Sequence, residues 1–396
     1  MQLSPDLLNL DRVTRIVRCT LSRPEATILS WHSEPIAYAS VGPDSRGLFR
    51  LSGTALSAGK LYGWEVILKV FRPLPDRSTT LPTSDHYWKR EALAYTSGLL
   101  DTLPEGLVAP CCYDVEEMAD GSLWLWLELV QSHLSPPWPL SRFQLAAYHL
   151  GVFNGQYLVG RSLPCHAWLS NGMTRIWAEE NAYTLDLIGQ EDAWESFPLR
   201  QAFPHPVRHR LLRLWNERHV NYGALDSLPK TICHHDAGHR NLFADQTEAG
   251  TERTLLIDWE LVGYGAIGEE LANLFAPAII NFEIGPDKAE ALASAIVDGY
   301  IEGLRAIGWQ GDTRLVRLGF AISAIFRWAF AAAGWPVAIV TDKSGQAERQ
   351  TLEQWGRPMD QVYLQWAGLT YYLLNLADEA DELRKAMTFY GKDRFC

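Results

Sequence analysis

The sequence predicts an α+β protein with a small, strand-rich N-terminal lobe and a larger, mostly helical C-terminal lobe. Apolar runs of strand type dominate residues 1–130. A stretch rich in proline and serine follows at residues 131–139, and beyond it the apolar residues recur with helical spacing. We therefore expect one lobe at residues 1–130 and a second lobe at residues 131–396.

Composition and charge describe a globular chain and limit its partners. Hydrophobic residues make up 47% of the 396 residues and charged residues 21%, which is typical of a folded protein with two cores. The net charge of −12 argues against nucleic acid as a partner. The six cysteines form no C-x-x-C pair and no signal peptide is visible, so a cytoplasmic protein is expected.

The most apolar stretch, residues 318–340, is expected to be a buried helix rather than a membrane span. Arg327 lies in its middle, and Gly334 and Pro336 are expected to break it. No membrane and no protein partner is implied by the sequence.

The N-terminal lobe is expected to begin with a helix and continue as a sheet. Ser4 and Pro5 are typical of a helix start, and an amphipathic segment ends near Cys19. Strand-like runs follow at residues 26–33, 34–41, 47–51, 64–71, 110–115 and 122–130, the last two flanking a hairpin turn.

Lys69 is the most informative residue of this lobe. A lysine inside an apolar strand is costly to bury without a partner of opposite charge. The segment beginning at Ser84 carries helix-capping residues and places Glu91 in its second turn. A surface lysine and a surface glutamate would be the simpler interpretation of these two residues in isolation.

The C-terminal lobe contains the densest group of functional side chains, in residues 231–260. A short apolar run precedes a loop with Asp236 and Asn241, and a second apolar run ends at Asp258. One carboxylate can take or orient an acceptor hydroxyl, while an amide and a second carboxylate are hard oxygen ligands for magnesium. Helices are predicted around this region at residues 141–159, 206–222, 286–307, 313–333 and 360–385.

His234-x-Asp236-x-x-x-x-Asn241, followed by Ile257-Asp258-Trp259-Glu260, resembles the catalytic and metal loops of the aminoglycoside phosphotransferase and choline kinase family. This resemblance implies a protein-kinase-like, two-lobed fold, with ATP (or alternatively GTP) and Mg²⁺ as cofactors. It implies that an N-terminal nucleotide-binding lobe precedes a lobe with the substrate site. It covers roughly residues 36–275, with the remainder matched only in helical character.

The resemblance also implies a role for each site residue. Asp236 is the expected catalytic residue, and Asn241 and Asp258 are the expected metal ligands. Lys69 is expected to hold the nucleotide phosphates and Glu91 to hold Lys69.

Two further nucleotide contacts follow from the same family. Backbone groups from Glu128 to Val130 are expected to meet the adenine edge, as the hinge does in related folds. Residues 42–47 are either a loop over the phosphates or an ordinary hairpin turn, because they match no glycine fingerprint.

Some residues depart from the family pattern. Many members carry glycine at the place of His235 and a histidine one residue before the place of His239. Trp259-Glu260 replaces the phenylalanine-glycine pair of protein kinases. These departures weigh more against protein-kinase activity than against phosphorylation of small molecules.

The predicted function is transfer of phosphate from ATP to a hydroxyl of a small molecule, such as an aminoglycoside, another antibiotic, a sugar or a choline-like amino alcohol. One alternative is a zinc-dependent hydrolase built on His234, His235, Asp236 and His239. That alternative leaves Lys69 without a role. A second alternative is a nucleotide-binding pseudoenzyme.

Overall fold

The computed structural model describes residues 8–36, 46–73, 80–203, 206–238 and 240–391. The chain divides into two compact units, and each is described by itself. The first unit comprises Met1–His133, His166–Leu169 and Phe243–Val262; the second comprises Leu134–Cys165, Ser170–Leu242 and Gly263–Cys396. Residues 166–169 and 243–262 thus belong to the first unit, although the division expected from sequence put them in the second lobe.

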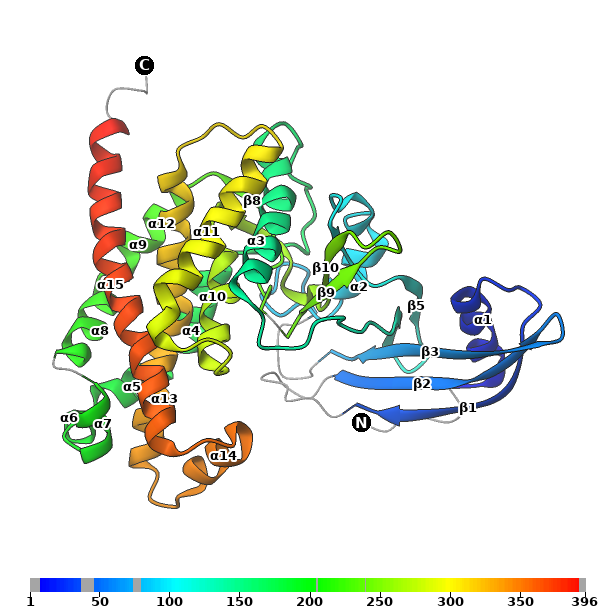
Figure 1. The fold of residues 1–396 in the computed structure, drawn as a ribbon, viewed down its shortest axis with the longest axis horizontal. Helices are drawn as coiled ribbons and strands as arrows, with labels where there is room; N and C mark the ends of the chain where they lie inside the picture. Colours follow the sequence, from blue (N-terminus) through cyan, green and yellow to red (C-terminus); the bar gives the residue numbers. More distant parts are fainter. Residues whose placement is uncertain (1–7, 37–45, 74–79, 204–205, 239, 392–396) are drawn as a thin grey trace. The chain divides into compact units, whose positions relative to one another are not determined.

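The first unit is built on a five-stranded antiparallel sheet in the order β1-β2-β3-β6-β5 (Figure 1). Its elements are α1 (Leu10–Leu21), β1 (Thr27–Pro35), β2 (Arg46–Ser57), β3 (Lys60–Phe71), α2 (Arg90–Thr96), η1 (Leu100–Thr102), β4 (Leu107–Val108), β5 (Cys112–Glu117), β6 (Leu123–Glu128), β9 (Leu242–Gln246, whose first residue belongs to the second unit), β10 (Glu252–Leu256) and η3 (Trp259–Leu261).

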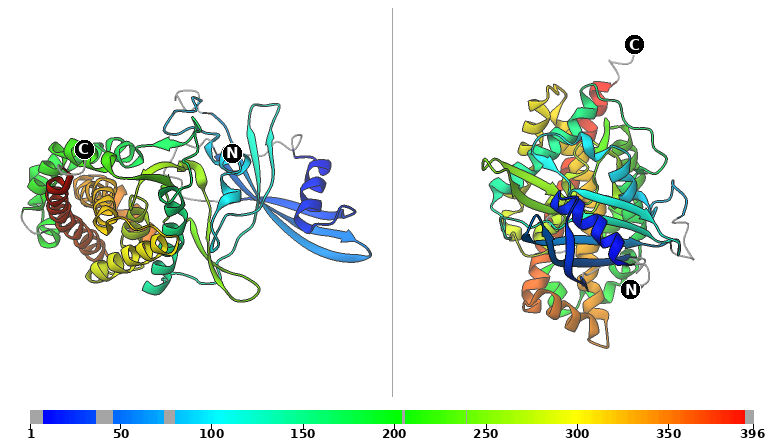
Figure 2. Two further views of the ribbon diagram at one scale, coloured as in Figure 1. Left: turned by 90° about the horizontal axis from the view of Figure 1, so that it is seen from above. Right: turned by 90° about the vertical axis from the view of Figure 1, so that its right-hand side faces the viewer.

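The two faces of this sheet bury different residues, because successive side chains of a strand point to opposite faces. One face packs against α1, as Figure 2 shows, with Val66 and Leu68 of β3 beside Val13 and Ile16 of the helix. The other face packs against α2 and carries the alternate β3 residue Phe71. Lys69 belongs by its register to this second face.

The second unit is mostly helical and contains a small sheet in the order β7-β11-β8. Its elements are α3 (Leu140–Gly155), η2 (Gln156–Leu158), β7 (Ser170–Asn171), α4 (Met173–Glu180), α5 (Tyr183–Gly189), α6 (Glu191–Trp194), α7 (Phe197–Ala202), α8 (Val207–Asn216), α9 (Arg218–Ser227), β8 (Lys230–Cys233), β11 (Gly263–Ala266), α10 (Leu271–Ile280), η4 (Pro286–Lys288), α11 (Ala289–Ala306), α12 (Thr313–Ala324), η5 (Ile325–Ala329), α13 (Phe330–Thr341), α14 (Gln346–Trp355) and α15 (Met359–Gly391).

Close helix packing shapes the core of the second unit. Helices α3 and α11 run side by side (Figure 1), and glycines let their backbones approach. A Cβ on Gly151 would lie 2.2 Å from the carbonyl oxygen of Tyr300. The predicted α+β fold, with a strand-rich N-terminal part and a helical C-terminal part, is therefore confirmed.

Among the described residues, one helix, Thr313–Thr341, is long and apolar enough to cross a membrane, and 83% of its most apolar window is buried inside the protein. The expectation of a buried helix is confirmed. The expected break is wrong, because the helix continues through Gly334 and Pro336. A Cβ on Gly334 would lie 2.9 Å from Cβ of Thr184, so the absence of a side chain there serves packing rather than a turn.

Three other helix boundaries differ from the expectation. The first helix begins after Asn9, whose side chain caps it, while Ser4 and Pro5 lie outside the described residues. The predicted helix at residues 206–222 is two helices, α8 and α9, which meet at Glu217. The helix expected from Ser84 begins only at Arg90.

Candidate active site

Lys69 of β3 lies between two carboxylates in the first unit. Its Nζ is 2.6 Å from Oε1 of Glu91 and 3.1 Å from Oδ1 of Asp258. The side chain of Glu91 is 1% exposed, so its charge depends on the lysine. Burial lowers the pKa of Lys69, but the carboxylates of Asp258 and Glu91 outweigh burial and raise it above the usual value. The lysine is therefore a cation at neutral pH.

Asp258 reaches Lys69 from a strained turn. Its backbone has φ 65° and ψ 60°, in the left-handed region that an aspartate adopts only at some cost. The next residue, Trp259, is completely buried and donates through Nε1 to the carbonyl of Leu256 at 2.9 Å. This buried indole holds the turn, so the carboxylate of Asp258 has a defined position beside Lys69.

Arg90 explains why α2 begins late. Its buried guanidinium donates to the carbonyls of Ser84 and Asp85, which holds the preceding residues in turns instead of a helix. It also donates to the carbonyls of Trp168 and Glu260, so it joins α2 to the turn after Asp258. Burial lowers the pKa of Arg90 to about 10. Glu91 consequently lies in the first turn of α2, not the second turn.

The other predicted nucleotide contacts lie at the end of β6. The amide of Glu128 donates to the carbonyl of Cys111 at 2.9 Å, and its Oε2 accepts from the Cys111 amide at 3.0 Å. Val130 follows β6 and is partly exposed. Residues 42–45 of the candidate phosphate loop lie outside the described residues.

Asp236 lies on the loop after β8 in the second unit, and amides hold both of its carboxylate oxygens. Asn241 donates from Nδ2 to Oδ2 at 2.8 Å and to the Asp236 carbonyl at 3.0 Å. Asn273 of α10 donates to Oδ1 at 3.1 Å and to the carbonyl of His235 at 2.7 Å. Sequence reasoning missed Asn273, because nothing in its neighbourhood along the chain marks it.

The two histidines of this loop serve its backbone. His234 accepts a hydrogen bond from the amide of Asp236 through Nδ1 at 3.1 Å. His235 has φ 67°, and its Nε2 donates to the carbonyl of Tyr264 at 3.2 Å. Its left-handed backbone is the conformation that glycine adopts most readily, which accounts physically for the family's glycine at this place.

Glu270 braces the same loop from the start of α10. Its Oε1 accepts from the amides of His234 and His235 at 2.7 and 3.0 Å, and its Oε2 accepts from Asn154 at 3.0 Å. Asn154 also accepts from the hydroxyl of Tyr300 at 2.8 Å. Burial raises the pKa of Glu270 to about 7, although these hydrogen bonds act in the opposite direction.

This raised pKa predicts a pH-dependent stability. A carboxyl whose folded-state pKa lies above its usual 4.5 stabilises the fold at acidic pH, and that contribution is lost as pH rises towards 7. The Glu270→Gln variant does not ionise, so its free energy of unfolding, minus that of the wild type, should increase by about 2–3 kcal/mol from pH 5 to pH 8. Urea unfolding at both pH values measures this change. Equal differences at the two pH values would show that Glu270 does not titrate between them.

The zinc alternative needs His239 as one of its ligands. His239 lies outside the described residues, while the rings of His234 and His235 have the backbone partners given above. Within the described ranges, no three His, Cys, Asp or Glu side chains form a group that could hold a metal.

Asn241 in the second unit and Asp258 in the first each carry an oxygen of the kind that a hard divalent cation prefers. The Nδ2 of Asn241 is engaged with Asp236, which turns its Oδ1 away from that carboxylate. Asp258 contributes a carboxylate that already binds the cationic Lys69 through one oxygen. Amide and carboxylate oxygens suit Mg²⁺ and suit softer metals poorly.

A family match bears on this arrangement. Residues 166–310, which include Asp236, Asn241 and Asp258, match the model of a family described as "Phosphotransferase enzyme family". This segment is phosphotransferase-like. The predicted resemblance to the aminoglycoside phosphotransferase group is thereby confirmed, and so is the prediction of a phosphotransferase enzyme. No curated protein matches the chain.

Solved structures of kinases are also similar to this chain. Amicoumacin kinase in complex with AMP-PNP, Ca²⁺ and Ami is 15% identical, with a TM-score of 0.48 over 87% of this chain and 89% of that chain. A microcompartment-associated aminopropanol kinase is 11% identical, with a TM-score of 0.49 over 94% and 98%. Choline kinase from Cryptosporidium parvum Iowa II is 13% identical, with a TM-score of 0.46 over 92% and 99%.

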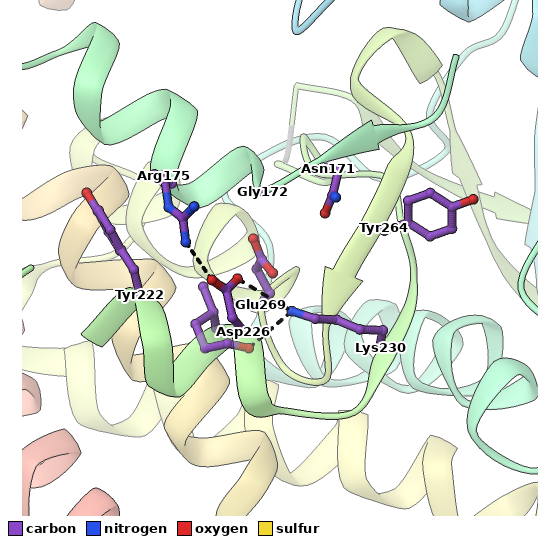
Figure 3. Close-up of a pocket in the computed structure, with 9 residues that line it drawn as sticks. Asn171, Gly172, Arg175, Tyr222, Asp226, Lys230, Tyr264 and Glu269 are labelled. Atoms are coloured by element: carbon purple, nitrogen blue, oxygen red, sulfur yellow. Dashed lines mark hydrogen bonds and ion pairs between the residues drawn. The ribbon is translucent and has the colours of Figure 1, made fainter. Parts of the chain in front are cut away.

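The second unit also contains a small pocket that is distinct from the loop of Asp236 (Figure 3). Its volume is ≈ 10 Å³, roughly the space for one water molecule. Asp226 lies in it between Arg175 and Lys230. We do not place the acceptor there, because neither Asp236 nor Asn241 lines it.

Proposed function

We propose that this protein is a kinase that transfers the γ-phosphoryl group of ATP to a hydroxyl of a small molecule. The observation that carries the proposal is Lys69 between Glu91 and Asp258. Three segments far apart in the sequence meet there in an ion-pair network around the buried carboxylate of Glu91. One of them lies in the segment that matches the phosphotransferase family. Asn241 and Asn273 each donate to one carboxylate oxygen of Asp236. A fixed carboxylate serves catalysis, and a nucleotide-binding pseudoenzyme would not require it.

The proposed chemistry balances without a further reactant. The acceptor hydroxyl oxygen forms a bond to the γ-phosphorus, and the bond from that phosphorus to the oxygen bridging the β- and γ-phosphates breaks. Asp236 takes the hydroxyl proton, and ADP leaves with the bonding electron pair. Asn241 and Asn273 keep the carboxylate of Asp236 in one orientation, so that little reorganisation is needed at the moment of transfer.

Magnesium and the nucleotide base complete the proposal. Asn241 and Asp258 are the proposed Mg²⁺ ligands, and Mg²⁺ when bound neutralises charge on the phosphates. Lys69 holds the phosphates, and Glu91 holds Lys69. We propose that the amide of Val130 and the carbonyl of Glu128 meet the adenine, because the Glu128 amide donates to Cys111. A guanine base is the alternative, and a cytoplasmic location stays a prediction.

Calorimetric titration with ATP tests the nucleotide part. We expect one site whose affinity for ATP requires Mg²⁺, and we expect Asp258→Ala to weaken binding by about 10-fold or more, since it removes both a proposed ligand and a partner of Lys69. Asp245→Ala is the matched control, because Asp245 is paired with Arg253 and has no proposed role. Retention of zinc through purification, without any response to nucleotide, would support the hydrolase instead.

A further inference from the structure

Arg327 is a buried cation with unused hydrogen-bond donors. It is 2% exposed and lies in η5, a single π-helical turn between α12 and α13. Its Nε and Nη2 are buried and donate to no acceptor among the described residues. Isolated π-helical turns inside α-helices are frequent at functional sites, and an unsatisfied guanidinium is costly to bury.

Nearby carboxylates balance the charge of Arg327 without accepting its hydrogen bonds. The acidic groups that act on it are Asp236, Glu269 and Glu270, and burial lowers its pKa despite them. Amides hold both oxygens of Asp236, and backbone amides with Asn154 hold Glu270. Glu269 accepts from Thr174 and from the amide of Ala266, each at 2.7 Å. These carboxylates therefore leave two hydrogen-bond donors of Arg327, Nε and Nη2, without an acceptor among the described residues.

Two half-buried tryptophans accompany Arg327. The Cζ atom of Arg327 is 5.0 Å from the ring centre of Trp177 on α4, and that ring is 6.1 Å from the ring of Trp328. Trp328 donates from Nε1 to Oδ1 of Asn273 at 3.1 Å, and Asn273 donates to Asp236. The π-helical turn is thus linked to the proposed catalytic carboxylate through a single amide side chain.

We propose that Arg327 binds an oxyanion, a carboxylate or a phosphate, of the acceptor substrate, with Trp177 and Trp328 beside the body of that substrate. A planar guanidinium donates two parallel hydrogen bonds to such a group. An ammonium group has only donors, so it offers no acceptor to the two unused donors of Arg327. The inference rests on the proposed function, and it favours hydroxylated acids or phosphorylated sugars over amino alcohols and aminoglycosides.

Binding of small probes to the full chain tests this proposal without a known substrate. Malonate and inorganic phosphate are titrated at constant ionic strength with saturating Mg²⁺ and ADP, which occupy the proposed nucleotide positions. Ethanolamine is the cationic probe, and tryptophan fluorescence and thermal unfolding are the two readouts. We expect both oxyanions to bind and ethanolamine not to bind. Stronger binding of ethanolamine, or no binding of either oxyanion, would overturn the proposal.

Variants assign the binding to Arg327. Arg327→Gln should weaken malonate binding by about 10- to 100-fold, the range for a charge-assisted hydrogen bond. Arg327→Lys keeps the charge and should lose part of the affinity, and it is the fallback where Arg327→Gln does not fold. Arg317→Gln is the matched control on the same helix, because Arg317 already binds both oxygens of Glu379. Unchanged malonate binding in folded Arg327 variants would reduce Arg327 to a structural counter-ion.

The same samples separate this inference from the proposed function. If ATP with Mg²⁺ binds but oxyanion binding does not depend on Arg327, the inference fails and the kinase proposal stands. If the oxyanions bind through Arg327 but no nucleotide binds, the kinase proposal fails. Once oxyanion acceptors are tested, glucuronate should be phosphorylated with a kcat/KM at least about 10-fold above that of glucosamine. The reverse preference would contradict the proposal.

Discussion

Replacing Lys69 by alanine should destabilise the protein by about 3–5 kcal/mol, because it leaves the carboxylate of Glu91 buried without a counter-charge. Glu91→Ala should destabilise it too. The double variant should be more stable than the sum of the two changes predicts, with a coupling of about 1–3 kcal/mol between the two side chains. Urea unfolding of the four proteins in this cycle, without nucleotide, measures the coupling.

Arg50 and Glu65 offer the matched control on the neighbouring strands β2 and β3. They also form an ion pair, but their side chains are 38% and 39% exposed. Solvent screens such a pair, so the same cycle at these positions should show much weaker coupling. Strict additivity at Lys69 and Glu91 would show that the two side chains do not interact, and the placement of α2 beside β3 would be wrong.

Asp236→Asn should leave the affinity for ATP with Mg²⁺ nearly unchanged and reduce turnover by about 10²-fold or more. Asparagine keeps the shape of the side chain, but it does not take a proton at neutral pH. Calorimetry measures the affinity, and release of ADP with an accepted substrate measures turnover. Asp226→Asn changes an exposed aspartate of the same unit and should retain full activity. Loss of nucleotide binding in Asp236→Asn would make Asp236 a metal ligand, and normal turnover would move the chemistry elsewhere.

Local sequence signals mark the residues that carry the proposed chemistry, while their roles follow from the family resemblance. Lys69 stands out because a charge interrupts an apolar strand, and the structure supplies the partner that burial requires. The loop of Asp236 and Asn241 stands out because polar side chains gather after a short apolar run. The strands β5 and β6 follow from two strand-like runs and from a turn at Gly121, which has φ 78°.

The supporting residues could not be predicted, because their partners are distant in the sequence. Asn273 meets Asp236 across 37 positions, and Arg90 meets Glu260 across 170 positions. No local pattern marks an amide or a guanidinium that is buried by tertiary packing. Arg327 illustrates this point. In the sequence it is only a charge inside an apolar stretch, which argues against a membrane span. Its neighbourhood with Asp236 and Trp177 exists only in the folded unit.

Some helix boundaries were predicted wrongly, again because tertiary contacts decide them. Gly334 and Pro336 have poor helix propensity, yet the packing of α13 against α5 maintains the helix through them. At Ser84 the capping residues are present, but the guanidinium of Arg90 binds the carbonyls of Ser84 and Asp85 and keeps the segment in turns. Tertiary contacts override local preference in both places.

Phosphorus NMR of the wild-type protein tests the central claim most directly. The full chain is incubated with ATP, Mg²⁺ and a mixed panel of hydroxylated acids, phosphorylated sugars, sugars, amino alcohols and aminoglycosides. The account predicts a new phosphate monoester signal that grows together with ADP and is lost in Asp236→Asn. Inorganic phosphate as the only new product, or unchanged ATP although the nucleotide binds, would contradict the account.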